Sequence, residues 1–252
     1  MEVFVITTFF VGFGLLACWE HGAPARPFPA RPFWRLRGLV FLAVSYGVSL
    51  AVPLAVDEHL AAHRLFDATA LGHAGGAVVG ILLVDLGQYL WHRTIHRVTP
   101  LWRLHQLHHS AERIDIYSSM MFHPFDVAGF TLTSSFALAF VVGLTPQATL
   151  IAAGFMGLLS IWQHANVKTP HWLGYFLHRP ESHTRHHERG VHGYNYGGLA
   201  LFDILFGTFD NPRDWEGAVG FYEGASSRVG EMLLGLDVSE PMPPDTVRPA
   251  VV

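Results

Sequence analysis

Long apolar segments without charged side chains most constrain what this chain can fold into. Residues 3–19 and 38–56 contain no charge, and residues 70–91 contain one acid, Asp85. A membrane-spanning helix needs about 20 consecutive, mostly apolar residues. Each of these three segments is therefore predicted to cross a membrane. Because the first begins after Glu2 and not after a basic stretch, we interpret it as a retained anchor and not as a signal peptide.

A fourth segment, residues 127–163, is also uncharged and is too long for one crossing. The Thr145–Pro146 pair near its middle is typical of a turn. The segment either crosses twice as a hairpin or enters the membrane and returns. The sequence thus predicts an all-α membrane protein with four to five transmembrane helices.

The composition excludes several classes of protein. Only 14% of the residues are charged and the net charge is −4, so there is no basic surface for nucleic acid. Cys18 is the one cysteine, which excludes an intrachain disulfide and a cysteine-ligated iron–sulfur cluster. No glycine-rich nucleotide fingerprint follows a strand pattern.

The loops predict the orientation in the membrane. The 19–37 connection is rich in arginine, whereas the 57–69 connection has three acids, Asp57, Glu58 and Asp67, against one arginine, Arg64. Excess arginine marks the cytoplasmic side, so the third span and the 127–163 hairpin both return to the cytoplasm. We expect one domain over 1–237, with a cytoplasmic helical cap built from 92–125 and 164–235. The tail, 238–252, lacks periodicity and is predicted to be disordered.

Histidines are concentrated where this cap begins. The chain has 17 of them, and the spacing H-x-x-H-H occurs twice, in LHQLHHS (104–110) and ESHTRHHERG (181–190). On a helix such residues share an arc of roughly 100°, so each group can direct its ring nitrogens to one point. His92 and His96 form a similar pair. Eight imidazoles are too many for one four-coordinate zinc and favour two metal ions, although ligand type alone does not choose between iron, copper, zinc and nickel.

These motifs resemble the fatty acid hydroxylase superfamily, the sterol desaturase-like membrane enzymes. The resemblance covers about 85–210 and rests on DLGQYLWHRTIH, LHQLHHS, QHAN, PESHTRHH and NYGGLALFDILFGT. It implies two iron ions at the cytoplasmic face, O2 as co-substrate, and hydroxylation or desaturation of a lipid C–H bond. The ligands that it implies are His92, His96, His105, His108, His109, His164, His183, His186 and His187.

Two positions depart from the pattern or extend it. Lys168 stands where some family members have a further histidine, so a tenth ligand is absent or comes from elsewhere. His123, in FHPFD, is either a ligand or a neighbour of the site. His171, His178 and His192 are expected beside the site without binding metal, and His21, His59, His63 and His73 are expected to have no role.

Ligating imidazoles usually donate their second N–H to a carboxylate or carbonyl group. Asp85, Asn195 and Asp203 are the candidates for this supporting role, because an acid inside a span is costly and is functional by default. Tyr89 and Tyr196 are expected to pack against the site.

We therefore predict an O2-dependent di-iron oxygenase that acts on a membrane lipid: fatty acyl, sterol-like or isoprenoid. Zinc is an ion that such a site can capture on purification. Electrons would come from a separate carrier, which is cytochrome b5-like, a ferredoxin or a reductase, and which the arginines near the histidines would attract (Arg93, Arg97, Arg103, Arg113 and Arg185). The alternatives are a zinc- or iron-dependent membrane hydrolase or isomerase, and a metal-handling membrane protein.

Overall fold

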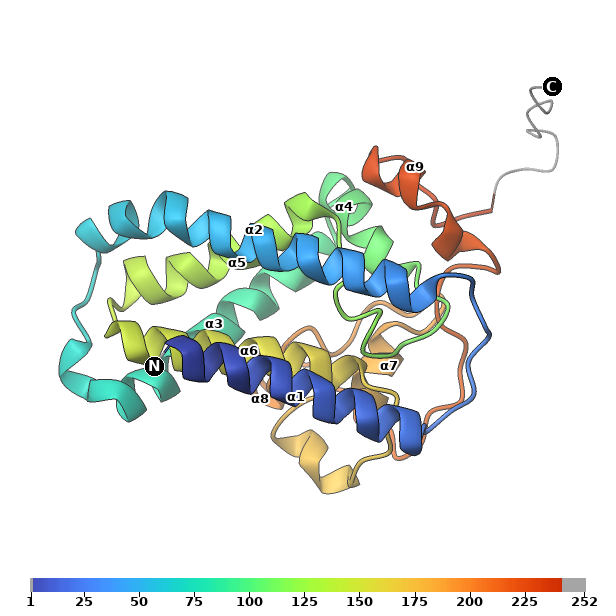
Figure 1. The fold of residues 1–252 in the computed structure, drawn as a ribbon, viewed down its shortest axis with the longest axis horizontal. Coiled ribbons are helices and arrows are strands. Elements are labelled where there is room, and N and C mark those ends of the chain that lie inside the picture. Colours follow the sequence, from blue (N-terminus) through green and yellow to red (C-terminus); the bar gives the residue numbers. More distant parts are fainter. Residues whose placement is uncertain (1, 242–252) are drawn as a thin grey trace.

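The protein is a bundle of long helices with shorter helices gathered toward one end (Figure 1). The computed structural model describes residues 2–241, with side chains from residue 7 onward. The long helices are α1 (Glu2–Gly22), α2 (Trp34–Ala62), α3 (Gly72–Ile95), α5 (Pro124–Ser135), which continues as the π-helix η2 (Phe136–Val141), and α6 (Pro146–His164). The described residues contain no strand, only two isolated bridges.

The remaining elements are short, and most of them follow the ends of α3 and α6. They are α4 (Thr99–His109), α7 (Pro180–His186), α8 (Ala200–Phe206) and α9 (Val229–Leu233), together with the 3-10 turns η1 (Thr69–Leu71), η3 (His171–Tyr175) and η4 (Ala225–Ser227). Most of them carry the segments that the sequence assigns to the cap.

Three helical segments are long and apolar enough to cross a membrane: Trp34–Ala62, Thr69–Ile95 and Pro124–Val141. They expose apolar side chains, such as Leu54 on α2 at 86% exposure, which suits contact with lipid. The four to five spans expected from sequence include two more segments, which correspond to α1 and α6. The 127–163 segment does form a helical hairpin, because the chain turns between Val141 and Pro146.

Local sequence explains the turn of this hairpin. The Thr145 hydroxyl accepts a hydrogen bond from the Ala148 N–H at 3.2 Å, and Pro146 occupies the first turn of α6. A threonine cap followed by proline is a strong start for a helix.

Small residues let the long helices approach closely. A Cβ atom at Gly80 of α3 would lie 3.0 Å from the Ala152 Cβ of α6, and one at Gly129 of α5 would lie 2.4 Å from Cζ2 of Trp91. Close packing at these glycines replaces the hydrophobic driving force that is missing inside a membrane. They hold the ends of α3 and α6 at fixed positions, and both ends carry histidines.

The C-terminal part packs on the outside of the cap. Val238 is buried with Leu107 and Met232, and its N–H donates to Oε1 of Gln106 at 2.8 Å. The described chain thus remains packed at the first residue of the predicted tail, and residues 242–252 lie outside the described residues.

The Gly129 contact yields a prediction about stability. Gly129→Ala should lower the melting temperature in detergent, with a loss of about 1–3 kcal/mol, because the new Cβ overpacks against Trp91. Gly47→Ala is the matched control, since a Cβ there meets nothing within 4 Å and alanine favours the helix. Equal melting temperatures for the two variants would contradict this account of the α3–α5 contact.

Candidate metal centre

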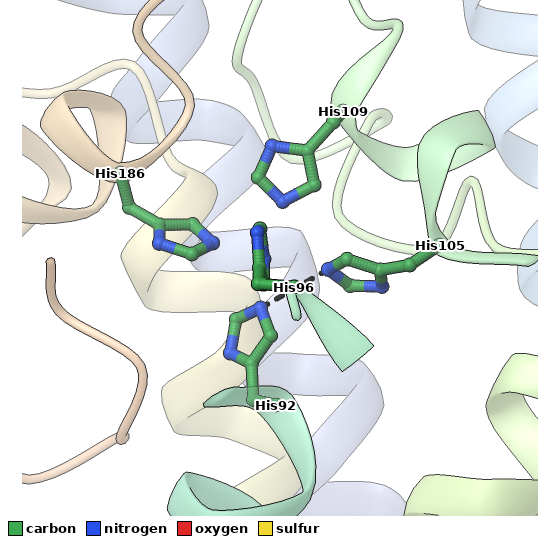
Figure 2. Close-up of side chains that lie close together, drawn as sticks. All are labelled: His92, His96, His105, His109 and His186. Atoms are coloured by element: carbon green, nitrogen blue, oxygen red, sulfur yellow. Dashed lines mark hydrogen bonds between the residues drawn. The ribbon is translucent and has the colours of Figure 1, made fainter. Parts of the chain in front are cut away.

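Nine imidazoles converge where α3 and α6 end, in two groups. Within each group the candidate ligand atoms lie within 4.8 Å of one another. The five-histidine group consists of His92, His96, His105, His109 and His186, and Figure 2 shows these rings pointing toward one another. The four-histidine group consists of His108, His164, His183 and His187. The structure therefore brings together all nine histidines that the sequence singled out.

Each H-x-x-H-H motif contributes to both groups. On α4, His105 and His109 belong to the five-histidine group and His108 to the other. On α7 and its C-cap the division is reversed, because His183 and His187 belong to the four-histidine group. Residues at i and i+4 share a helix face, whereas the residue at i+3 is rotated away from the first. The spacing thus lets one short helix serve two neighbouring centres.

Several rings are fixed through Nδ1. The Nδ1–H of His92 donates to the carbonyl of Tyr196 at 2.8 Å, and that of His186 to the carbonyl of Tyr194 at 2.7 Å. His164 donates to the carbonyl of Ser160 and His105 to Oδ2 of Asp126, each at 2.7 Å. In a neutral imidazole with a protonated Nδ1, the other nitrogen is an acceptor only. The Nε2 atoms of these four rings therefore present lone pairs.

The lone pairs face one another without a donor between them. Nε2 of His92 lies 3.0 Å from Nε2 of His105, and both rings use Nδ1 to donate elsewhere. Nε2 and Nδ1 of His96 and of His109 are buried with no hydrogen-bond partner among the described residues. Buried polar atoms are nearly always satisfied in folded proteins. A cation at the centre of the group would bind one nitrogen of each of these rings.

The second group shows the same spacing. Nε2 of His164 lies 3.0 Å from Nε2 of His108 and 3.1 Å from that of His183, and the His183 and His187 Nε2 atoms are 3.2 Å apart. For metal–nitrogen bonds of about 2.1 Å, ligands at right angles lie about 3.0 Å apart and tetrahedral ones about 3.4 Å apart. The observed spacing fits ions with more than four ligands, so the residues present fit two metal ions.

Burial favours the neutral form of five of these imidazoles on the cap helices. It lowers the pKa of His109 and His187 well below the ordinary value of 6.5, and neighbouring imidazoles lower the pKa further. The pKa values of His108, His183 and His186 are lowered well below 6.5 for the same reasons. Neutral imidazole is the form that binds metal.

The three candidate supporting residues act through the backbone. Asp85 Oδ1 accepts the N–H groups of Gly198 at 2.6 Å and Leu199 at 3.0 Å. Asp203 accepts the N–H groups of Tyr196 and Gly197, at 2.9 and 2.8 Å. Neither acid accepts a hydrogen bond from the nine imidazoles among the described residues. Instead, both fix the loop whose Tyr196 carbonyl orients His92.

Asn195 fixes the start of the same loop. Its backbone is left-handed, with φ 56°, and its side-chain amide donates to the carbonyls of Ser182 and Asp210, each at 2.8 Å. Because Ser182 precedes His183, this link joins the loop to α7. His178, expected only to flank the site, donates to Asp203 at 2.9 Å and so belongs to the same network.

One carboxylate contacts a ring of the cluster directly, and sequence reasoning missed it. Asp126, in the first turn of α5, accepts from His105 and is buried. The signal was the acid in FHPFD. His123 of that motif is in neither group; it caps α5 by accepting the Phe125 N–H at 3.1 Å. Lys168 is exposed and pairs with Asp214 at 2.9 Å, so it adds nothing to the four-histidine group.

A shallow cavity leads to the five-histidine group. It has a volume of about 180 Å³ and is lined by His96, Arg97, Thr99, Trp102 and His192. The Trp102 ring lies 5.2 Å from His96 and 5.4 Å from His109, measured between centroids. The four histidines that were expected to have no role lie in neither group: His21, His59, His63 and His73.

Comparison with known proteins agrees with this arrangement. The sequence profile of the family described as Fatty acid hydroxylase matches residues 77–208, which hold all nine imidazoles. The chain belongs to the fatty acid hydroxylase family. The resemblance noted from the motifs is thereby confirmed.

Relatives in this family act on different lipids, according to their names. Ornithine lipid hydroxylase OlsE from Rhizobium tropici is 31% identical over 70% of this chain and 55% of its own length. Alkylglycerol monooxygenase from Homo sapiens is 30% identical over 52% of this chain and 30% of its own, and Delta(7)-sterol-C5(6)-desaturase from Nicotiana tabacum is 27% identical over 59% and 55%. The chain thus spans at most about half the length of these relatives. No solved structure matches it.

The lowered pKa values predict an acid-sensitive fold. In the unfolded chain these histidines take up protons near pH 6.5, whereas in the folded chain they do not. The free energy of unfolding should therefore fall as the pH drops below 6.5. Each fully buried imidazole contributes about 1.4 kcal/mol per pH unit in that range. Thermal unfolding of the metal-free protein in detergent should give a lower midpoint at pH 5 than at pH 7.5. A midpoint that is constant over this range would contradict the burial of neutral imidazoles.

The Asp126 contact predicts a loss of metal affinity. Asp126→Asn keeps an acceptor for the His105 N–H but removes the negative charge that raises the basicity of Nε2, so metal affinity should fall about 10–100-fold. Metal titration of the purified variant measures this effect. Asp214→Asn, on the exposed pair with Lys168, is the matched control and should bind as the parent does. Parental affinity in Asp126→Asn would show that the carboxylate is only structural.

Proposed function

We propose that this protein is an integral membrane di-iron oxygenase that hydroxylates or desaturates a C–H bond of a membrane lipid. The observation that carries the proposal is the convergence of nine imidazoles into two adjacent groups, in a chain of the fatty acid hydroxylase family. Acid–base groups alone do not cleave unactivated C–H bonds. Iron ions held by the two groups would supply the redox chemistry with O2, which zinc cannot.

The five-histidine group would hold one ion and the four-histidine group the other, with Nε2 of His92, His105 and His164 among the ligands. Their Nδ1 contacts to Tyr196, Asp126 and Ser160 fix the ring planes before metal binds. The smaller group leaves more room for an external ligand. We assign no tenth histidine ligand to the four-histidine group. Lys168, which stands at the position of the further histidine, is exposed and pairs with Asp214.

Aromatic side chains on the membrane side would exclude water and position the substrate. Phe122 stacks on His108 with a centroid separation of 3.9 Å. Phe130, on the candidate span Pro124–Val141, lies 5.6 Å from His92 and 6.1 Å from His105. We infer that the lipid chain approaches between these phenylalanines from the side of α5, and that its reacting carbon stops beside the imidazoles.

The orientation follows from the loops. α1 and α6 pack together beside α3, so we propose that both cross the membrane with the three candidate spans, giving five crossings in all. The arginine-rich connection between α1 and α2 then lies in the cytoplasm. The histidine groups, at the same end of the bundle, would also face the cytoplasm (Figure 1).

Electrons would enter from a separate carrier at the Trp102 cavity. Of the arginines expected to attract it, Arg113 pairs with Asp115, and Arg185 pairs with Glu188 and Asp210. Arg97 and Arg103 are exposed, and Arg97 lines the cavity. An acidic carrier, cytochrome b5-like, a ferredoxin or a reductase, would dock there, with Trp102 between it and the five-histidine group.

The substrate is proposed only as a class. The named relatives act on an ornithine lipid, an alkylglycerol and a sterol. The alignment to the ornithine lipid hydroxylase covers the largest share of this chain among these three. We therefore place a polar-headed, acyl-chain lipid first among the candidates, before sterol-like and isoprenoid lipids.

Loss of single imidazoles tests the proposal. His108→Ala and His186→Ala, one in each group, should abolish turnover and reduce bound iron from two ions per chain. Turnover is measured as lipid that has gained one oxygen atom or lost two hydrogen atoms, by mass spectrometry of cells supplied with ¹⁸O2. His59→Ala, an exposed histidine on α2, is the matched control and should retain activity.

Two outcomes would count against an oxygenase. The first is near-parental turnover in both histidine variants, which would overturn the ligand assignment. The second is a product that forms without O2 or reductant, which would indicate a hydrolase or isomerase.

A further inference from the structure

A second and larger cavity lies away from the histidine groups, where α1 ends and α2 begins. It has a volume of about 370 Å³, and its lining includes Glu20, Arg26, Arg35, Arg113, Tyr117 and Asn166. Its walls combine apolar and aromatic surface with three guanidinium groups. None of the motifs that define the family contributes to it except Asn166 of QHAN.

Hydrogen bonds build the wall formed by the loop after α1. The Asn166 side chain accepts the Arg26 N–H at 3.1 Å and donates to the Arg26 carbonyl at 2.8 Å. The Asn166 carbonyl accepts the Ala25 N–H at 2.9 Å, and Glu20 Oε2 accepts the Asn166 N–H at 2.8 Å. The cavity is therefore a formed feature of the fold and not a gap between loose loops.

Arg26 has hydrogen-bonding capacity that the described residues do not use. Its Nη2 donates to the Thr184 hydroxyl at 2.9 Å, but Nε and Nη1 are buried with no acceptor among residues 2–241. The guanidinium lies 4.8 Å from the Trp215 ring centroid, which holds its plane. Burying guanidinium donors without acceptors costs free energy, and a nearby anion reduces this cost by neutralising the positive charge.

The charges around the cavity favour an anion. Arg35 is exposed at the start of α2, and its guanidinium lies 5.7 Å from the Tyr117 ring centroid. Arg113 pairs with Asp115 at 2.6 Å, so it contributes less. The one acid in the lining, Glu20, uses Oε2 to accept the N–H groups of Ile116 and Asn166. Within residues 2–241, neither Arg26 nor Arg35 forms an ion pair with an acid, and Glu181 acts on Arg26 only at longer range.

The position of the cavity indicates which anion it takes. It lies at the junction between the predicted 3–19 and 38–56 spans, on the arginine-rich side. Lipid headgroups occupy this depth, and anionic lipids attract arginine there. Ala17, Phe28 and Tyr117 offer apolar surface for the first carbons of an acyl chain.

We propose that this cavity binds the phosphate or carboxylate headgroup of an anionic membrane lipid. The guanidinium group of Arg35 contacts the headgroup oxygens, Arg26 contributes its positive charge from the cavity wall, and the aromatic wall holds the glycerol end. The inference does not depend on the proposed oxygenase activity, because it needs neither metal nor turnover.

Binding to short-chain lipids tests it. The full chain, purified in a neutral maltoside detergent, is titrated with dioctanoyl phosphatidic acid and examined by native mass spectrometry and calorimetry. We expect saturable binding of one lipid per chain. Dioctanoylglycerol, which has the same chains and no phosphate, should not bind at this site. Arg35→Gln and Arg26→Gln should each weaken binding about tenfold or more, since each removes a positive charge from the cavity wall.

Control variants and probes make the result decisive. Arg213→Gln removes an exposed arginine outside the cavity and should leave the affinity unchanged. Because Arg26 also links the loop to α7, Arg35→Gln is the variant that tests binding without disturbing the fold. Unchanged affinity in Arg35→Gln, or equal affinity for dioctanoylglycerol, would overturn the proposal. Inorganic phosphate binding as tightly as phosphatidic acid would show a site for a free anion and overturn the assignment to a lipid.

Discussion

Facing lone pairs of buried imidazoles are the constraint on which the rest of this structure depends. Nε2 of His92 and Nε2 of His105 approach to 3.0 Å although neither carries the proton. Such a pair is unfavourable unless a cation lies between the rings. His164 likewise donates through Nδ1, and its Nε2 lies 3.0 and 3.1 Å from the Nε2 atoms of His108 and His183. The cap helices, the glycine contacts and the buried carboxylates hold these rings in place. A bound metal ion would offset the repulsion between the facing ring nitrogens.

Support for the rings comes mainly from the backbone and in one case from a carboxylate. Asp85 and Asp203 bind the N–H groups of the 196–199 loop, and that loop presents the Tyr196 carbonyl to His92. Gly198 permits the approach, since a Cβ there would lie 3.1 Å from Asp85 Oδ1. An acid inside α3 therefore influences the metal centre through two successive hydrogen bonds. A chain of this kind transmits position and not charge.

The sequence predicts the site better than it predicts its supports. The i, i+3 and i+4 spacing identifies the imidazoles because helix geometry is local, and the apolar segments identify the long helices for the same reason. The partner of His105 is different: Asp126 lies 21 residues away, and only the packing of α5 against α4 brings it near. His123 and Asp126 both belong to the FHPFD motif but have different roles. His123 caps α5, whereas Asp126 orients the His105 ring. The count of spans also depends on packing, since α1 and α6 are assigned by their neighbours and not by hydropathy alone.

The division of each H-x-x-H-H motif between two centres has a consequence for biogenesis. His183 and His187 complete the four-histidine group, and His186 completes the other, so neither centre exists until the ribosome has passed residue 187. By then the upstream spans have emerged and can already be inserted. In the proposed enzyme, metal loading would therefore be a late event, which would need an ion source on the side of the membrane where the cap folds. A nascent chain arrested before α7 would carry six of the nine imidazoles and no complete centre.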